Sequence, residues 1–241
     1  MIRVRRWRPV AVLGWLGLIV CWIGANVSHR TFRDRRHAGR CLAPLLADYR
    51  GRQDVVVLAL PRGGVPVAYE VALALGAGLD VLLVRKLGVP GQEELAMGAI
   101  ASGGAMVVND RLVRELQIPP EVVEQVVTRE QTELVRRADA YRAGRVQLDV
   151  SGRVVVVVDD GVATGASLRA ALDALVPLQP KRVVVAVPVA PAGTMTMIDV
   201  LADEVVCAST PSSFGSVGGS YDDFTQVSDD EVRRLLAAAR P

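Results

Sequence analysis

Five consecutive valines, Val154–Val158, run directly into two aspartates and a loop of small residues. A continuous apolar run of this length is typical of a strand buried on both faces of a sheet. Similar runs occur at Val55–Leu60 and Val183–Val187, and segments with helical spacing separate them. Because parallel strands need crossover connections, this alternation predicts an α/β fold with a doubly wound, mainly parallel sheet flanked by helices.

Apolar periodicity and the positions of glycine and proline predict the remaining elements. We expect strands at 81–84, 105–108 and 205–207, and helices at 37–50, 65–75, 120–140, 166–175, 194–201 and 229–239. Residues 209–224 are predicted to form a tail loop. Four arginines are expected on the solvated face of the long polar helix: Arg129, Arg136, Arg137 and Arg142.

Polar groups follow three of the predicted strands. Arg62-Gly63-Gly64 comes after the strand at 55–60, Arg85-Lys86 after the strand at 81–84, and Asp159-Asp160 after the valine run. In open parallel sheets, ligands bind at the carboxyl ends of the strands where the strand order reverses. The sequence therefore predicts a single ligand site built from these three segments.

The stretch from Asp159 to Ser167 combines two carboxylates with a loop that suits a phosphate. Gly161, Ala163, Gly165 and Ala166 leave the backbone accessible, and a predicted helix begins there with unpaired N–H groups. Adjacent carboxylates repel one another and would repel a phosphate. A ligand with hydroxyls beside its phosphate, such as a ribose 5-phosphate, resolves this conflict. Alternatively, the aspartates hold a hydrated Mg²⁺.

Other phosphate-binding motifs fit this chain less well. The sequence lacks G-x-x-x-x-G-K-[ST] and G-x-G-x-x-G, which excludes a P-loop and the dinucleotide fingerprint. A receiver or phosphatase domain needs a lysine at the far end of a later strand, whereas Lys181 precedes its strand.

"VVVVDDGVATGAS", from Val155 to Ser167, resembles the thirteen-residue signature of the type I phosphoribosyltransferases. The resemblance implies that 5-phosphoribosyl 1-pyrophosphate (PRPP) binds here with Mg²⁺. Asp159 and Asp160 would hold the ribose hydroxyls and the metal, directly or through water. The 5-phosphate would contact Ala163, Thr164, Gly165, Ala166 and Ser167.

The similarity to this family extends over about the last 210 residues, from "FRDRRHAGR" at Phe32 onward. It implies a pyrophosphate-binding loop with Arg62, Gly63 and Gly64, and a catalytic pair formed by Arg85 and Lys86. Residues 87–104 would be a mobile catalytic loop, with a small hood and tail region around the site. Phe214 and Tyr221 are candidates for stacking on the acceptor, although packing against the core is an equal alternative for both.

Residues 1–30 differ in composition from the rest of the chain. They contain five arginines, no acidic residue and all three tryptophans, and residues 9–28 are uncharged. Such a run can span a bilayer, so a membrane tether is one interpretation, with the domain at 31–241 on the inner, cytoplasmic face. A cleaved signal peptide or an extension from a misplaced start site are the others.

Composition excludes several classes of function. Without residues 1–30 the chain has 23 basic and 26 acidic residues, so it lacks the basic character typical of nucleic-acid binding. The only histidines are His29 and His37, which argues against a hydrolase with a histidine base. The cysteines, Cys21, Cys41 and Cys207, show no zinc-site spacing.

We therefore expect an enzyme that transfers the phosphoribosyl group of PRPP to an unidentified, nucleobase-like small molecule and releases pyrophosphate. The alternative is a non-catalytic, PRPP-binding regulatory protein. Members of the family are often homodimers, so a homodimer is expected here as well.

Overall fold

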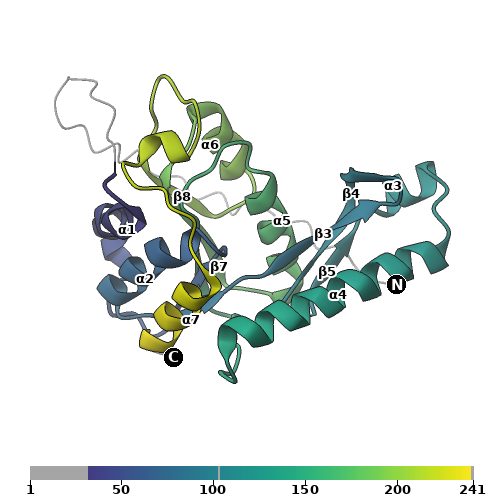
Figure 1. Cartoon of the computed structure of the whole chain (residues 1–241), viewed down its shortest axis with the longest axis horizontal. Helices are drawn as coiled ribbons and strands as arrows, with labels where there is room; N and C mark the ends of the chain where they lie inside the picture. Colours follow the sequence, from purple (N-terminus) through teal and green to yellow (C-terminus); the bar gives the residue numbers. More distant parts are fainter. Residues whose placement is uncertain (1–31, 103, 240–241) are drawn as a thin grey trace, which may run out of the picture.

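The structure of this protein, a computed structural model, describes residues 32–102 and 104–239. Five parallel strands form the central sheet in the order β2-β1-β6-β7-β8 (Figure 1). Their bounds are Val55–Ala59 (β1), Gly78–Val81 (β2), Val154–Val158 (β6), Arg182–Val189 (β7) and Glu204–Ser209 (β8). The prediction of a doubly wound, mainly parallel sheet is confirmed.

Alternate valines of β6 enter two different cores. Val155 and Val157 of β6 pack on one face with Leu168 and Leu172 of α5 (Ala166–Leu175), and α6 (Ala192–Asp199) lies on the same face. The other residues of β6 pack with α2 (Gly64–Leu75) and α7 (Asp229–Ala238) on the opposite face. Because both faces are covered, all five valines are buried, as their uninterrupted run predicts.

The strand order reverses between β1 and β6. From β1 the chain crosses to β2 on one side, whereas β6, β7 and β8 follow one another on the other side. The carboxyl ends of β1 and β6 lie side by side, and the backbone N–H of Leu60 donates to the carbonyl of Val158 at 2.9 Å. This reversal is the position at which open α/β sheets bind ligands.

A second, three-stranded antiparallel sheet forms the hood, beside the central sheet. It contains β3 (Val84–Val89), β4 (Gln92–Ala101) and β5 (Met106–Val108), and it is followed by α3 (Asp110–Glu115) and α4 (Pro120–Arg142). In Figure 1 the long helix α4 runs along this sheet. The prediction of a loop at 87–104 is wrong, because Pro90-Gly91 is only the hairpin turn, where Gly91 has φ +79°.

The prediction of one strand at 81–84 is also wrong. The central strand β2 ends at Val81, and Val84 begins β3 in the hood. The apolar run Val81–Val84 is continuous in sequence, so periodicity cannot reveal that it passes from one sheet to another. In consequence, Arg85 and Lys86 lie inside an antiparallel strand and not at the end of a core strand.

The N-terminal helix is shorter than predicted. The α-helix α1 covers Arg35–Leu42, and a 3₁₀ helix continues over Ala43–Tyr49. Pro44 at the second position of that segment has no N–H to continue the α-helical hydrogen bonds. In the C-terminal helix, Ser228 caps α7, since its hydroxyl accepts the N–H of Glu231.

The predicted membrane span at 9–28 lies outside the described residues. Across 32–102 and 104–239, no helix has both the length and the apolar character that crossing a membrane requires.

Candidate ligand site at the strand-order reversal

Two of the predicted segments meet at the reversal between β1 and β6. A Cβ atom on Gly63 would overlap the Oδ2 of Asp160 and lie 2.6 Å from its Cγ, and one on Gly64 would lie 2.7 Å from the carbonyl oxygen of Val158. Only glycine permits this approach. The loop 61–64 is therefore packed against the Asp159-Asp160 pair, as expected for parts of one site.

The loop 163–167, which follows the two aspartates, leads into α5 and is open to solvent. Gly165 occupies the N-cap position with φ +79°, and no side chain caps this helix end. The N–H of Ala166 makes a long contact of 3.5 Å with the hydroxyl of Thr164, and the helix dipole favours an anion at this end. Ala163, Thr164, Ala166 and Ser167 are exposed, while the carbonyl of Ala163 accepts the hydroxyl of the buried Thr194 at 2.7 Å.

The two aspartates have different partners. The Oδ2 of Asp160 is 2.7 Å from the Nε of Arg35, and both side chains are mostly buried. The Oδ1 of Asp159 accepts the backbone N–H of Asp160 at 2.8 Å. Burial and, next, the negative charge of Asp160 raise the pKa of Asp159. The pair therefore carries its charge unequally, with one carboxylate matched by a cation.

Sequence reasoning missed Arg35. It stands 125 residues from Asp160 and is one of several arginines in the segment 33–40, so no local pattern distinguishes it. The only signal in the sequence was the mutual repulsion of two adjacent carboxylates, which a nearby cation offsets.

The carboxylate pair fits the way in which proteins hold Mg²⁺ for phosphorylated substrates. Within the described part of the chain, no cluster of three or more histidine, cysteine or acidic side chains could hold a metal ion. Magnesium, however, is usually bound by one or two carboxylates together with substrate phosphates and water. Asp159 and Asp160 fit that arrangement and do not form an all-protein cage.

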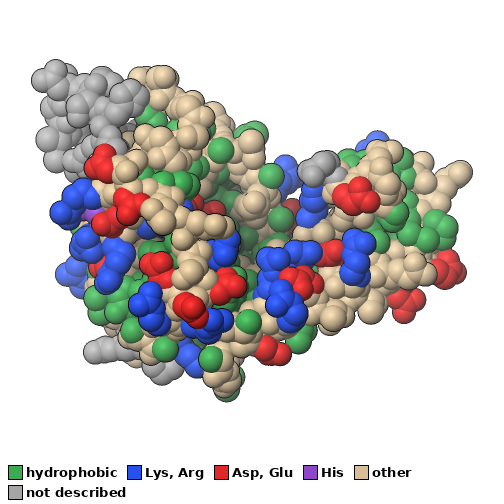
Figure 2. All heavy atoms as spheres, viewed as in Figure 1, with side chains coloured by type: hydrophobic (Ala, Val, Ile, Leu, Met, Phe, Trp, Pro, Cys, Tyr) green, Lys and Arg blue, Asp and Glu red, His purple; other side chains and the backbone are tan. Residues whose placement is uncertain are grey.

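A cleft of about 1220 Å³ lies between the central sheet and the hood. Figure 2 shows a hollow in this region, with lysine and arginine side chains beside it. The cleft brings together the predicted residues Arg62, Arg85, Lys86, Ala166 and Ser167. The start of α5, Arg62 and the basic pair of β3 therefore face one space, although Arg85 and Lys86 come from the hood.

Two of the cleft arginines are anchored by carboxylates. The Nε of Arg85 is 2.7 Å from the Oε2 of Glu130, a side chain of α4 that is only 8% exposed. A nitrogen of Arg62 lies 3.7 Å from Asp229 at the start of α7, and the hydroxyl of Tyr141 donates to the same carboxylate. The long helix α4 and the C-terminal helix α7 therefore position the basic groups of the cleft.

The two aromatic candidates lie away from the cleft. Tyr221 is 6% exposed, packs against Phe32 and donates its hydroxyl to the carbonyl of Asp160. Phe214 packs against the same apolar cluster. Both rings thus have the packing arrangement that was the alternative to stacking on an acceptor. Phe224 is the more exposed ring of this loop, and the guanidinium of Arg35 lies 3.8 Å from its centre.

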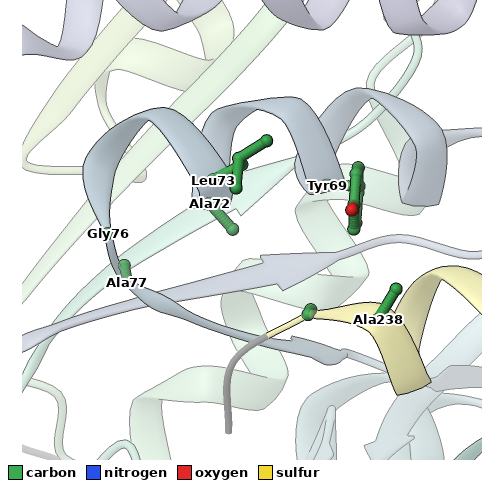
Figure 3. Close-up of a pocket in the computed structure, with 7 residues that line it drawn as sticks. Tyr69, Ala72, Leu73, Gly76, Ala77 and Ala238 are labelled. Carbon is green, nitrogen blue, oxygen red and sulfur yellow. The ribbon is translucent and has the colours of Figure 1, made fainter.

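A smaller pocket of about 200 Å³ lies between the end of α2 and the end of α7 (Figure 3). Tyr69 supplies its one polar side chain, and the remaining lining residues are alanine, leucine and glycine. This pocket contains no charged group that could bind a phosphate.

Comparisons with known proteins agree with this geometry. A family model, the phosphoribosyl transferase domain, matches residues 35–224. The chain is 49% identical over 210 residues to a Mycobacterium tuberculosis protein named provisionally as a phosphoribosyl transferase. That match covers 87% of this chain and 47% of the relative, so the chain spans about half the length of this relative.

One further relative is known from its sequence and another from its crystal structure. A protein of Chloroflexus aurantiacus named "Bifunctional protein PyrR" is 33% identical over 129 residues, which cover 52% of this chain and 65% of that protein. The crystal structure of TT1426 from Thermus thermophilus has a TM-score of 0.78 and 46% identity, and the match covers 88% of this chain and 100% of that one.

Proposed function

Since the chain belongs to the phosphoribosyl transferase domain family, we propose that it transfers the 5-phosphoribosyl group of PRPP to a nucleobase-like acceptor and releases pyrophosphate. The observation that carries this proposal is the contact between the loop 61–64 and Asp160, next to the open loop 163–167. This contact supports a single site in which the loop 61–64 binds pyrophosphate, the two aspartates bind the ribose hydroxyls and the loop 163–167 binds the 5-phosphate.

The chemistry explains why these groups should surround that point. Phosphoribosyl transfer breaks the bond between ribose C1 and pyrophosphate, so the sugar becomes cationic and the leaving group gains negative charge. Positive groups and N–H donors are needed where that charge develops. Arg62 and the amide of Gly63 would contact the pyrophosphate from the core side, and Arg85 with Lys86 from the hood. The N–H of Gly64, also predicted as a contact, instead donates to the carbonyl of Leu60 at 3.0 Å.

The other segments would hold the rest of PRPP. The 5-phosphate would accept N–H groups of residues 163–167 at the start of α5, with the hydroxyls of Thr164 and Ser167 nearby. The carboxylates would accept the ribose hydroxyls. Mg²⁺, held by the carboxylates and the ligand, would neutralise charge on the pyrophosphate. Approach of the hood toward the central sheet would exclude the water that hydrolyses the sugar cation.

Calorimetry with PRPP, in the presence and absence of Mg²⁺, tests the binding half of the proposal. We expect PRPP to bind with Mg²⁺, and the Asp159→Asn/Asp160→Asn double variant to bind at least about tenfold more weakly, which is about 1.4 kcal/mol. Asp110→Asn, an exposed carboxylate of α3 in the hood, is the matched control and should bind normally. Equal affinity in all three proteins would reject the site.

A pyrophosphate-release screen with purine, pyrimidine and pyridine acceptors tests the catalytic half. Release with one class of acceptor identifies the transferase and its substrate class together. If PRPP binds but no acceptor supports release, the regulatory alternative replaces the enzyme.

A further inference from the structure

Arg35 occupies a position that the proposed chemistry does not use. Its Nε donates to Asp160 at 2.7 Å, and its Nη1 donates to the carbonyl of Thr225 at 2.8 Å. Its guanidinium also lies 3.8 Å from the centre of the Phe224 ring. The side chain is only 10% exposed, so the contact with Asp160 is shielded from solvent.

The backbone around Arg35 is fixed by a distant part of the chain. Asp34 caps α1 by accepting the N–H of His37 at 2.7 Å. The residues just before α1 exchange backbone hydrogen bonds with the tail loop: the N–H of Phe32 donates to Ser220, and the N–H groups of Asp222 and Asp223 donate to Phe32 and Arg33. Arg35 is therefore held where its side chain meets Asp160 and Phe224.

On its other side, Asp160 is confined by the pyrophosphate loop. Its Oδ2, the oxygen that Arg35 binds, also lies where a Cβ of Gly63 would be. Any movement of this carboxylate therefore moves the contact with the loop 61–64. An unpaired Asp160 would place a second negative charge beside Asp159 and the ligand's phosphates, which is unfavourable in a partly buried site.

We propose that Arg35 is a positioning residue that neutralises Asp160 and holds it against Gly63, so that the ligand meets the net charge of one carboxylate instead of two. This inference rests on the proposed binding of PRPP. It gives the two aspartates different roles: both would contact the ribose hydroxyls and Mg²⁺, but only Asp160 also joins α1 to the loop 61–64.

A double-mutant cycle on Arg35 and Asp160, read as the affinity for PRPP with Mg²⁺ by calorimetry, tests the inference. We expect Arg35→Met to weaken binding at least about tenfold, because it leaves Asp160 unpaired. Arg35→Lys keeps the charge and should weaken binding less. Arg35→Met/Asp160→Asn removes both charges and should bind PRPP more tightly than Arg35→Met alone, which a purely structural role of Arg35 would not produce.

Arg36→Met is the matched control, because Arg36 is the next residue of α1 and pairs with a different carboxylate, Glu70, at 2.6 Å. It should leave PRPP affinity unchanged. Circular dichroism and urea unfolding of each variant identify any that fail to fold. If Arg35→Met fails to fold, the PRPP affinities of Arg35→Lys and Arg35→Lys/Asp160→Asn are compared instead.

The outcomes separate this inference from the function on which it rests. No binding of PRPP by the wild-type protein would overturn the proposed function and, with it, this role of Arg35. Normal binding by the wild type with no recovery in the double variant, or with no loss in Arg35→Met, would overturn the role of Arg35 alone.

Discussion

Arg142 and Asp80 form a buried ion pair that joins the end of α4 to the end of β2. The Nε of Arg142 lies 3.0 Å from one carboxylate oxygen of Asp80 and 3.3 Å from the other, and its Nη2 donates to the carbonyl of Val81. The same carboxylate accepts the backbone N–H groups of Val81 and Leu148. Both side chains are at most 10% exposed. The expectation that Arg142 lies on a solvated helix face is wrong, because the C-terminal end of α4 turns into the core.

This pair leads to the first prediction. Arg142→Met should lower the free energy of unfolding by about 3–5 kcal/mol, since it leaves the Asp80 carboxylate buried without its cation. Urea unfolding monitored by circular dichroism measures the change. Arg111→Met serves as control, because its pair with Glu115 is exposed on α3 and is worth about 0.3–0.5 kcal/mol. Similar losses in the two variants would show that burial does not distinguish the pairs.

Gly63→Ala should weaken PRPP binding more than it weakens the fold. The added Cβ would overlap the carboxylate of Asp160, so the loop 61–64 must move away from the site. We expect a loss of affinity of about tenfold or more, equivalent to about 1.4 kcal/mol. Gly193→Ala, in a helix with no heavy atom within 4 Å of the new Cβ, should bind normally. Unchanged affinity in Gly63→Ala would show that the loop does not contact the ligand.

Arg85→Ala should slow pyrophosphate release by about 100-fold, by analogy with the loss of one preorganised group at a developing negative charge. Arg129→Ala provides a close comparison, because Arg129 and Arg85 pair with the same carboxylate, Glu130, but the Arg129 side chain is 66% exposed. Rates are compared at saturating PRPP. If both variants are equally slow, the effect arises from Glu130 and not from Arg85.

Tyr49 makes stability sensitive to alkaline pH. Burial, and next the hydrogen bond of its hydroxyl to Glu204, raise the pKa of Tyr49 to about 12 from 10.0. The folded state thus binds the Tyr49 proton more tightly than the unfolded state does. The contribution of this proton to the free energy of unfolding is complete below about pH 10 and is lost as the pH rises toward about 12. Between these pH values, the free energy of unfolding of the wild type should fall by about 1–2 kcal/mol more than that of Tyr49→Phe.

Unfolding in urea at several pH values between about 8 and about 11.5 measures this difference. Arg182 donates to Glu204 at 2.9 Å and keeps that carboxylate paired in the Phe variant, so the comparison isolates the tyrosine hydroxyl. Parallel curves for the two proteins would contradict the predicted titration.

The sequence by itself determined the central sheet and the local chemistry of its loops. A strand buried on both faces must be apolar throughout, so the runs at 55–60, 154–158 and 183–187 mark core strands without further information. Glycines and hydroxyl side chains between such a strand and the next helix can bind an anion through neighbouring groups alone. The segments 62–64 and 159–167 could therefore be identified as candidate ligand-binding loops from the local sequence. Both segments lie at the reversal of strand order, as the alternation of elements predicts.

Only the tertiary structure decided which distant groups meet there. Arg35 reaches Asp160 across 125 residues, Glu130 holds Arg85, and the apolar run 81–84 divides between two sheets. Periodicity reports which face of its own element a residue occupies, whereas these contacts depend on how whole elements pack, and packing is fixed by the combined burial of many side chains. The charge that balances the two aspartates therefore comes from a helix that no local pattern connects to them.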